Sequence, residues 1–221
     1  MKVGFLVAME NEYFPFLTKL GSLVNSEVLC GIEFCMYSSD NGEIVLAKCG
    51  IGEIASSAAT SLLIGHFGCG VIVNFGLVGA LVELPKGGVV LVKDVVHYDC
   101  DLTPFGRPLG EPAGLDVVAF PASLSDFAID SSFPLVRLAS GDKFVADPER
   151  KEWIKANFSA DICDMEGAGV AITAYRAGVP FIMIKLVSDA AGEGAVAEFT
   201  ASKERAFDFA VDFVLSVIAR R

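Results

Sequence analysis

The sequence lacks the features that would point to a membrane or to an oxidising compartment. No apolar run reaches the length of a membrane span, and acidic residues follow the apolar N-terminal run where a signal-peptide cleavage site would lie. The cysteines form no C-x-x-C pair and no metal-finger spacing; they are Cys30, Cys35, Cys49, Cys69, Cys100 and Cys163. We therefore expect a soluble cytoplasmic protein with reduced thiols.

The sequence is also poor in positive charge. Its 17 Lys and Arg residues are outnumbered by 28 Asp and Glu residues, and the formal net charge is -11. This balance argues against a nucleic-acid backbone or an anionic membrane as the partner. It does not restrict a small ligand, because a pocket rather than the overall charge selects such a molecule.

Apolar residues, in contrast, are plentiful. They make up 53% of the 221 residues, which is enough for strands buried on both faces and for a subunit interface. Apolar β-rich runs alternate with helical patterns along the chain. This order predicts one α/β domain over residues 1–221, a three-layer α/β/α sandwich with a mixed central sheet.

Hydrophobic periodicity and turn residues predict the individual elements. Strands are expected at Val3–Val7, Ser26–Cys30, Glu33–Tyr37, Glu43–Ala47, Val71–Asn74, Val89–Val96, Val136–Ala139 and Phe181–Val187, with a further short run at Ala160–Asp164. Helices are expected at Glu10–Leu20, Gly52–Phe67, Asp147–Asn157, Glu166–Arg176 and Glu198–Ala219. The segment from Phe105 to Ser132 is rich in Gly and Pro and is expected to be mainly loop. A turn at Asp40-Asn41-Gly42 joins two of the short strands.

Carboxylates follow several of the predicted buried strands. Glu12 follows the first strand, Glu166 follows the run that ends at Asp164, and Asp189 follows the strand Phe181–Val187. Open α/β sheets bind ligands beyond the carboxyl ends of their strands. Because solvation of a surface does not require acids from three strand ends on one rim, we interpret them as a site.

Such a set of acids suits the cleavage of a glycosidic bond. The transition state resembles an oxocarbenium ion, so anions beside the sugar stabilise its positive charge. The departing group gains negative charge and needs a proton from an acid with a raised pKa. From the residues alone, a sugar hydrolase or a cation site remains an equal alternative.

Each feature also has a purely structural explanation. Glu12 and Glu166 lie in predicted first helical turns, where the helix dipole favours acids. The Cys49–Gly52 segment resembles a phosphate cradle, but two glycines in a tight turn explain it equally well. The His97–Asp101 segment contains metal-binding residue types, yet successive strand residues alternate sides and cannot all meet one ion. No metal is expected.

Several motifs resemble the bacterial 5'-methylthioadenosine/S-adenosylhomocysteine nucleosidases, within the nucleoside phosphorylase/nucleosidase superfamily. They occur in order and at near-constant spacing over essentially the whole chain. The matching segments are Met1–Glu12, Gly50–Glu53, His97–Gly106, Ser140–Asp142, Asp164–Ala168 and Val187–Asp189. The resemblance implies a nucleoside phosphorylase-like fold and hydrolysis of a purine nucleoside by water, with no cofactor.

The resemblance also implies roles for the residues at the reacting bond. Glu12 positions and helps to deprotonate the attacking water, and Asp189, supported by Ser188, protonates the purine at N7. Glu166 accepts hydrogen bonds from the ribose hydroxyls. Met165 packs under the ribose.

Further residues are implied to bind the base and the 5'-substituent. Phe144 stacks on the base and the backbone of Val145 reads its edge. The substrate-binding set also includes Ile51, Phe199, Met9 and Lys185. A homodimer is implied, in which Leu102 and Phe105 reach the 5'-pocket of the neighbouring subunit.

The chain departs from the family pattern on the nucleophile side of the site. Leu77 stands where these nucleosidases usually have a serine, and Lys185 stands where an arginine is expected. Lysine keeps the charge but loses the planar fork of hydrogen-bond donors. Arg107 adds a charge after Phe105-Gly106, near the wall of the 5'-pocket.

Two alternatives to hydrolysis remain open from the sequence. A phosphorylase would use phosphate as the nucleophile, but Glu10 and Glu12 stand where such enzymes carry a Gly-Asp-Pro-x-Arg loop, and they would repel phosphate. A nucleoside-binding protein with weak catalysis is suggested by Leu77 and Lys185. The presence of Glu12, Glu166 and Asp189 together favours the hydrolase.

Overall fold

A mixed β-sheet forms the centre of the molecule in the computed structural model, which describes residues 2–17, 19–39, 42–126, 132–202, 212 and 214–216. The strands are β1 (Val3–Val7), β2 (Ser22–Leu29), β3 (Ile32–Ser39), β4 (Gly42–Lys48), β5 (Val71–Ala80), β6 (Val89–His97), β7 (Ala119–Pro121), β8 (Leu135–Ser140), β9 (Ile162–Asp164) and β10 (Phe181–Asp189). The helices are α1 (Glu10–Leu17), α2 (Glu53–Gly65), α3 (Pro148–Phe158), α4 (Gly167–Ala177) and α5 (Ala195–Ser202), with short 3-10 turns η1 (Thr103–Phe105) and η2 (Leu124–Asp126).

The sheet combines parallel and antiparallel pairs, as the sequence predicts. β1 lies between β4 and β5 and is parallel to both, while β2, β3 and β4 form an antiparallel extension. β5 also pairs with β10 and β9, and β10, β6, β8 and β9 continue from one to the next. Because the last of these strands returns to β5, this half of the sheet closes on itself.

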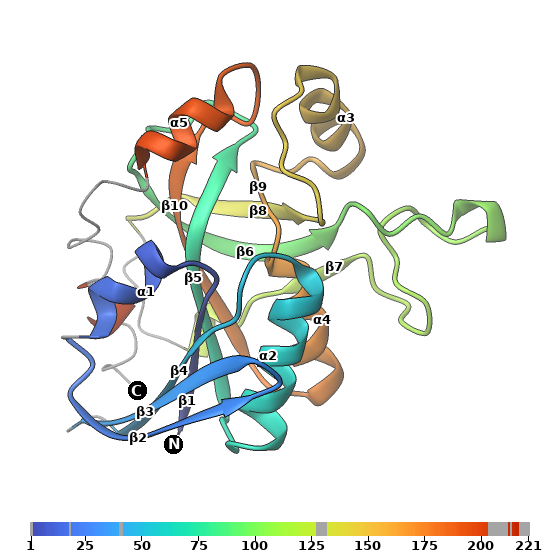
Figure 1. Ribbon diagram of the computed structural model, residues 1–221. Helices are drawn as coiled ribbons and strands as arrows, with labels where there is room; N and C mark the ends of the chain where they lie inside the picture. Colours follow the sequence, from blue (N-terminus) through green and yellow to red (C-terminus); the bar gives the residue numbers. More distant parts are fainter. Residues whose placement is uncertain are drawn as a thin grey trace.

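Helices cover both faces of the sheet, which gives the expected α/β/α layers (Figure 1). Successive residues of β1 point to opposite faces, so Phe5 packs in one core with Phe16 of α1, and Leu6 packs in the other core with Leu63 of α2. Helices α2 and α4 lie side by side on that second face. Both faces of the strand are therefore buried, in agreement with the high apolar content.

Several element boundaries differ from those predicted. The first helix ends at Leu17 rather than Leu20, and β2 begins at Ser22 rather than Ser26. The segment predicted as loop from Phe105 contains β7, which pairs with β6. The last helix begins at Ala195 instead of Glu198, and most of its predicted continuation to Ala219 lies outside the described residues. Asp40 and Asn41 of the predicted turn also lie outside them.

The largest difference concerns β5. The sequence predicts a strand that ends at Asn74, but the strand continues to Ala80 and all of its residues are buried. Gly76 and Gly79 suggest a turn, since glycine weakens an isolated strand. Here β10 pairs with β5 along this stretch, and these ladder hydrogen bonds outweigh the local preference of glycine.

The segment between β6 and β7 projects away from the body of the molecule (Figure 1). Arg107 holds part of it together, because its guanidinium donates to Glu111 at 2.8 Å and to the Leu115 carbonyl at 2.9 Å. The charge of Arg107 is thus already balanced within its own segment. Among the described residues, no helix is long and apolar enough to cross a membrane, and none of them form a group suited to holding a metal ion.

Candidate active site

A cavity lies at the carboxyl ends of β5, β9 and β10, beside the start of α1. Most of the predicted site residues line it: Met9, Glu12, Ile51, Phe144, Val145, Met165, Glu166, Ser188, Asp189 and Phe199. These residues are far apart in the sequence, and the sheet topology brings them together. The end of the sheet predicted to hold the ligand therefore contains a cavity with acidic and apolar walls.

Glu12 is fixed by backbone donors from two elements. Its Oε2 accepts hydrogen bonds from the N–H groups of Ala8 and Met9, each at 3.0 Å. Its Oε1 accepts one from Leu77 N–H in β5 at 2.9 Å. The carboxyl is almost completely buried, and this burial raises the pKa of Glu12, although the backbone donors and the charge of Lys185 oppose the shift.

Glu166 precedes α4 and faces a second acid. Its Oε1 accepts a hydrogen bond from Gly52 N–H at 2.9 Å. Burial, followed by the negative charge of Asp164, raises the pKa of Glu166 to about 8. A carboxyl in this state can release or take up a proton near neutral pH.

Lys185 forms a buried ion pair beneath the cavity. Its ammonium lies 2.7 Å from Oδ2 of Asp164, and both side chains are only 1% exposed. Asp164 Oδ1 also accepts the N–H of Gly167, the first residue of α4, at 3.0 Å. The sequence pattern did not reveal the charge interaction between Asp164 and Lys185. Lys185, which was predicted to bind the substrate, does not itself line the cavity, whereas its partner Asp164 does.

Asp189 ends β10 in a buried position. Its Oδ1 accepts a hydrogen bond from Ala191 N–H at 2.8 Å. Ser188 Oγ lies 2.7 Å from Asp189 Oδ2 and 3.0 Å from the carbonyl oxygen of Val78, and can donate to either. Burial raises the pKa of Asp189, while the Ser188 hydroxyl and the Ala191 N–H oppose the change. A carboxyl that keeps its proton to higher pH is suited to act as an acid.

The remaining walls are apolar and aromatic. Phe144 and Phe199 meet edge to face with ring centroids 5.5 Å apart. Phe144 is 43% exposed and Ile51 is 56% exposed, so both lie at the mouth of the cavity. Val145 and Met165 line it from other sides. Such walls suit a flat, weakly polar ring next to the carboxyls.

Leu102 and Phe105 do not line this cavity. Both belong to the projecting segment, and the Phe105 side chain is 82% exposed. Leu102 directly precedes η1 and Phe105 is its last residue. Gly106 then ends the turn with a left-handed φ of 74°. Their expected contact is with a neighbouring subunit, so one chain leaves the prediction for these two residues untested.

Comparisons with known proteins agree on one family. Residues 2–219 match the phosphorylase superfamily. A 5'-methylthioadenosine/S-adenosylhomocysteine nucleosidase from Shewanella denitrificans is 34% identical over 209 residues, which are 90% of either chain. This chain belongs to that nucleosidase family. The resemblance seen in the sequence motifs is thereby confirmed.

Solved structures of two related nucleosidases are similar over nearly their whole length. A mutant of the 5'-methylthioadenosine/S-adenosylhomocysteine nucleosidase (MTAN) from Helicobacter pylori, with 5'-methylthioadenosine in its active site, is 30% identical to this chain. Its TM-score is 0.93 over 98% of this chain and 97% of that one. Futalosine hydrolase from Helicobacter pylori is also 30% identical, with a TM-score of 0.91 over 99% of this chain and 97% of that one. The nucleosidase fold is therefore shared by enzymes named for different nucleosides.

Sequence reasoning missed some walls of the nucleosidase cavity. The additional lining residues are Leu77, Val78, Gly79, Lys143, Cys163 and Asp164. Leu77 was noted only for the hydroxyl it lacks, yet its backbone N–H binds Glu12. A backbone donor leaves no trace in the residue type. Asp164 could have been found, because it directly precedes Met165-Glu166 at the end of a buried strand.

Proposed function

We propose that this nucleosidase hydrolyses the N-glycosidic bond of a 5'-modified adenine nucleoside, with 5'-methylthioadenosine and S-adenosylhomocysteine as the first candidates. Water attacks C1' and the purine leaves. The observation that carries the proposal is the presence of three buried carboxyls, Glu12, Glu166 and Asp189, on one cavity and in three different environments. Membership of the nucleosidase family supports the same reaction.

Each carboxyl takes a separate step in this mechanism. Asp189 gives its proton to N7 of the purine, which neutralises the charge that develops on the leaving base. Glu166 accepts hydrogen bonds from the ribose hydroxyls and stabilises the positive sugar ring. Glu12 receives a proton from the attacking water. The three backbone donors on Glu12 hold its oxygens in place for this step.

The apolar walls hold the nucleoside around these acids. Phe144 stacks on the purine, with Phe199 against its edge, and the backbone of Val145 pairs with the polar edge of the base. Met165 packs under the ribose, while Met9 and Ile51 contact the sugar and the 5'-group. Burial of these surfaces excludes bulk water, which strengthens the interactions of the carboxyls with the reacting atoms.

Water is favoured over phosphate by the charges around the cavity. Among the described residues at the site, Lys185 faces Asp164 at 2.7 Å and Lys143 lies 3.4 Å from Asp99. Each of these two ammonium groups already has a carboxylate partner, which would compete with a bound phosphate. Glu12 in its ionised form, which accepts the proton of the water, would repel an anionic nucleophile. Leu77 contributes its backbone N–H to this side of the cavity, and Glu12 thereby remains oriented without a serine hydroxyl.

The functional unit is proposed to be a cytoplasmic homodimer. Leu102 and Phe105 of the projecting segment reach the 5'-pocket of the neighbouring subunit and close it. The high exposure of Phe105 supports this arrangement, since a large aromatic side chain gains free energy when a partner covers it.

Product analysis tests the proposal. The protein is incubated with 5'-methylthioadenosine, S-adenosylhomocysteine, adenosine and inosine, with and without phosphate. Free base together with a free ribose sugar, at a rate independent of phosphate, is the expected result. Ribose 1-phosphate would identify a phosphorylase. Binding without base release would identify a nucleoside-binding protein, and either outcome contradicts hydrolysis.

A further inference from the structure

The backbone N–H and C=O of Ala190, directly after Asp189, are both bound by charged side chains. Lys151 of α3 donates from its Nζ to the Ala190 carbonyl oxygen at 2.6 Å. Glu198 of α5 accepts the Ala190 N–H with its Oε2 at 3.0 Å. The two consecutive peptide groups that Ala190 joins, directly after the proposed acid, are thus each tied to a different helix. Hydrogen bonds to charged groups are the stronger ones in proteins.

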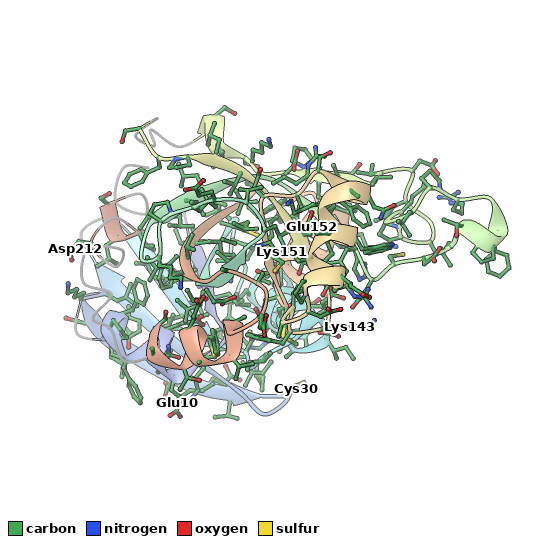
Figure 2. The ribbon with its side chains drawn as sticks, turned by 90° about the horizontal axis from the view of Figure 1, so that it is seen from above. Glu10, Cys30, Lys143, Lys151, Glu152 and Asp212 are labelled. Atoms are coloured by element: carbon green, nitrogen blue, oxygen red, sulfur yellow. The ribbon has the colours of Figure 1, made fainter. Side chains whose placement is uncertain are left out.

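The Lys151 side chain also connects two strands. Its Nζ lies 3.1 Å from the carbonyl oxygen of Ala80 at the end of β5, as well as 2.6 Å from that of Ala190 beyond β10. Figure 2 shows this end of the molecule from above, with Lys151 labelled on α3. One ammonium therefore ties the end of β5 to the residue that follows Asp189 at the end of β10.

Glu198 has a second partner that anchors it. Its Oε1 lies 2.5 Å from Nζ of Lys86, which belongs to the turn between β5 and β6. The next residue in α5 is Phe199, which lines the cavity. The Glu198 carboxylate consequently connects the residue after Asp189, the turn before β6 and the helix that carries the aromatic wall.

The path of the turn after Asp189 decides where its carboxyl lies. Ala191 adopts a left-handed φ of 48°, which is uncommon for a residue other than glycine, and its N–H binds Asp189 Oδ1. The turn also packs against β5, since a Cβ on Gly79 would lie 2.9 Å from Ala191 Cβ and 3.0 Å from Asp189 Oδ1. A strained turn in this position requires support from its surroundings.

We propose that Lys151 and Glu198 are positioning residues that clamp the backbone of Ala190 and thereby orient the carboxyl of Asp189 for proton transfer. Neither side chain is needed to touch the nucleoside. The inference rests on the proposed function for its effect on rate, but the clamp itself is a property of the free protein. Misplacement of a catalytic group by a fraction of an ångström lowers the rate of the chemical step more than binding.

Charged groups around Asp189 come from several elements. The negative charge of Glu198 raises the pKa of Asp189 and the positive charge of Lys86 lowers it. Lys151 and Glu83 border the hollow behind Asp189, and the Cys163 thiol faces it from β9. Loss of the Lys151 charge therefore accompanies loss of its hydrogen bonds, and variants must separate the two effects.

Kinetic variants test the clamp. Lys151→Met removes the donor, Lys151→Arg retains charge and donors, and Lys155→Met on the same helix is the matched control, because Lys155 pairs with Glu152 one turn away. We expect kcat to fall roughly tenfold in Lys151→Met with KM changed less than about threefold. The alkaline limb of the pH profile of kcat should shift in Lys151→Met. Lys151→Arg should recover most of the wild-type rate.

Amide exchange supplies a readout that does not depend on activity. The Ala191 N–H, protected by Asp189 in the wild type, should exchange roughly tenfold faster in Lys151→Met and Glu198→Ala, and remain protected in Lys155→Met. Unchanged exchange together with unchanged kcat would overturn the clamp while leaving the hydrolase intact. If the wild type releases no base, the proposed function fails, and amide exchange alone decides on the clamp.

Discussion

At the scale of single residues, the site separates its carboxyls by their surroundings rather than by their type. Glu12 has three backbone donors on its two oxygens, whereas Glu166 faces the negative charge of Asp164. Asp189 is supported by one hydroxyl and one N–H. The same functional group can therefore act as an acceptor in one place and as an acid in another.

Replacement of Asp189 tests the acid directly. Asp189→Asn keeps the shape and can still bind the hydrogen-bond partners, but it has no proton to give to the purine. General acid catalysis typically contributes about 10²–10⁴-fold, so kcat should fall by at least about 100-fold while the Kd for a nucleoside changes only a few-fold. The two values can be measured by base release and by titration calorimetry.

The matched variant Glu166→Gln should affect binding as well as rate. Glu166→Gln replaces the carboxyl proposed to accept hydrogen bonds from the ribose hydroxyls with an amide, and it should weaken binding as well as slow the reaction. Wild-type turnover in Asp189→Asn would eliminate Asp189 as the acid. Equal losses of binding in the two variants would contradict the separate roles.

The sequence predicts which carboxyl side chains line the cavity, but it does not predict the backbone groups that hold them. The rule that acids follow buried strands predicted Glu12, Glu166 and Asp189, because it depends on the chain direction of the strands alone. It could not predict the contact of Leu77 N–H with Glu12, nor that of Lys151 with Ala190. Both depend on how distant elements pack, and no residue type requires them.

At the scale of elements, two close contacts explain why glycine occurs inside regular structure. Gly76 lies where a Cβ would be 3.3 Å from Glu12 Oε1 and 3.6 Å from Lys185 Nζ. Gly169 lies in α4, where a Cβ would be only 2.3 Å from Ser56 Oγ and 2.4 Å from the Glu53 carbonyl. The first allows charged side chains to approach β5, and the second allows α2 and α4 to lie against each other.

The second contact gives a prediction for stability. Gly169→Ala should lower the free energy of unfolding by about 1–3 kcal/mol, because the added methyl would collide with the backbone of α2. Gly65→Ala in α2 is the control, since nothing lies within 4 Å of its Cβ position, and alanine is the better helix former by about 1 kcal/mol.

Urea unfolding of both variants measures the difference. A Gly169→Ala protein as stable as the wild type would show that the helices can separate at little cost. A large loss of stability in Gly65→Ala would mean that glycine is required at that position for a reason other than space.

Element boundaries were predicted best where local signals agree with packing. α3 begins at Pro148, within one residue of the predicted start, and Asp147 is its N-cap, whose side chain accepts the N–H groups of Glu149 and Arg150. β5 was predicted too short, because Gly76 and Gly79 oppose strand formation locally. Its pairing with β10 reverses this preference, and such pairing between distant segments is not visible in the local pattern.

At the scale of the whole molecule, the buried carboxyls make stability depend on pH. The pKa values of Glu12, Glu166 and Asp189 are all raised, chiefly by burial. The folded protein therefore binds protons more tightly than the unfolded chain at these sites. Since the unfolded state releases them first, the free energy of unfolding falls as the pH increases through this range.

The window for Glu166 extends from its ordinary pKa of 4.5 to about 8. We expect the ligand-free protein to be most stable near pH 5 and to lose stability toward pH 8, by at most about 1.4 kcal/mol per pH unit for each such carboxyl. Glu166→Gln should make this dependence less steep. Unfolding in urea at pH 5, 6, 7 and 8 checks the prediction, and a stability that increases over this range would refute it.

The neighbouring positions of β1, β5 and β10 have a consequence for biosynthesis. β1 supplies the start of the site within the first residues of the chain, but Asp189 ends a strand that pairs with β5 over a separation of more than 100 residues. A nascent chain on the ribosome thus contains Glu12, the proposed acceptor of the water proton, long before it contains Asp189, the proposed acid. Pairings of such long range also fold slowly. If Asp189 is the acid, activity requires that β10 has been translated, and translation products that end before β10 should not cleave nucleosides.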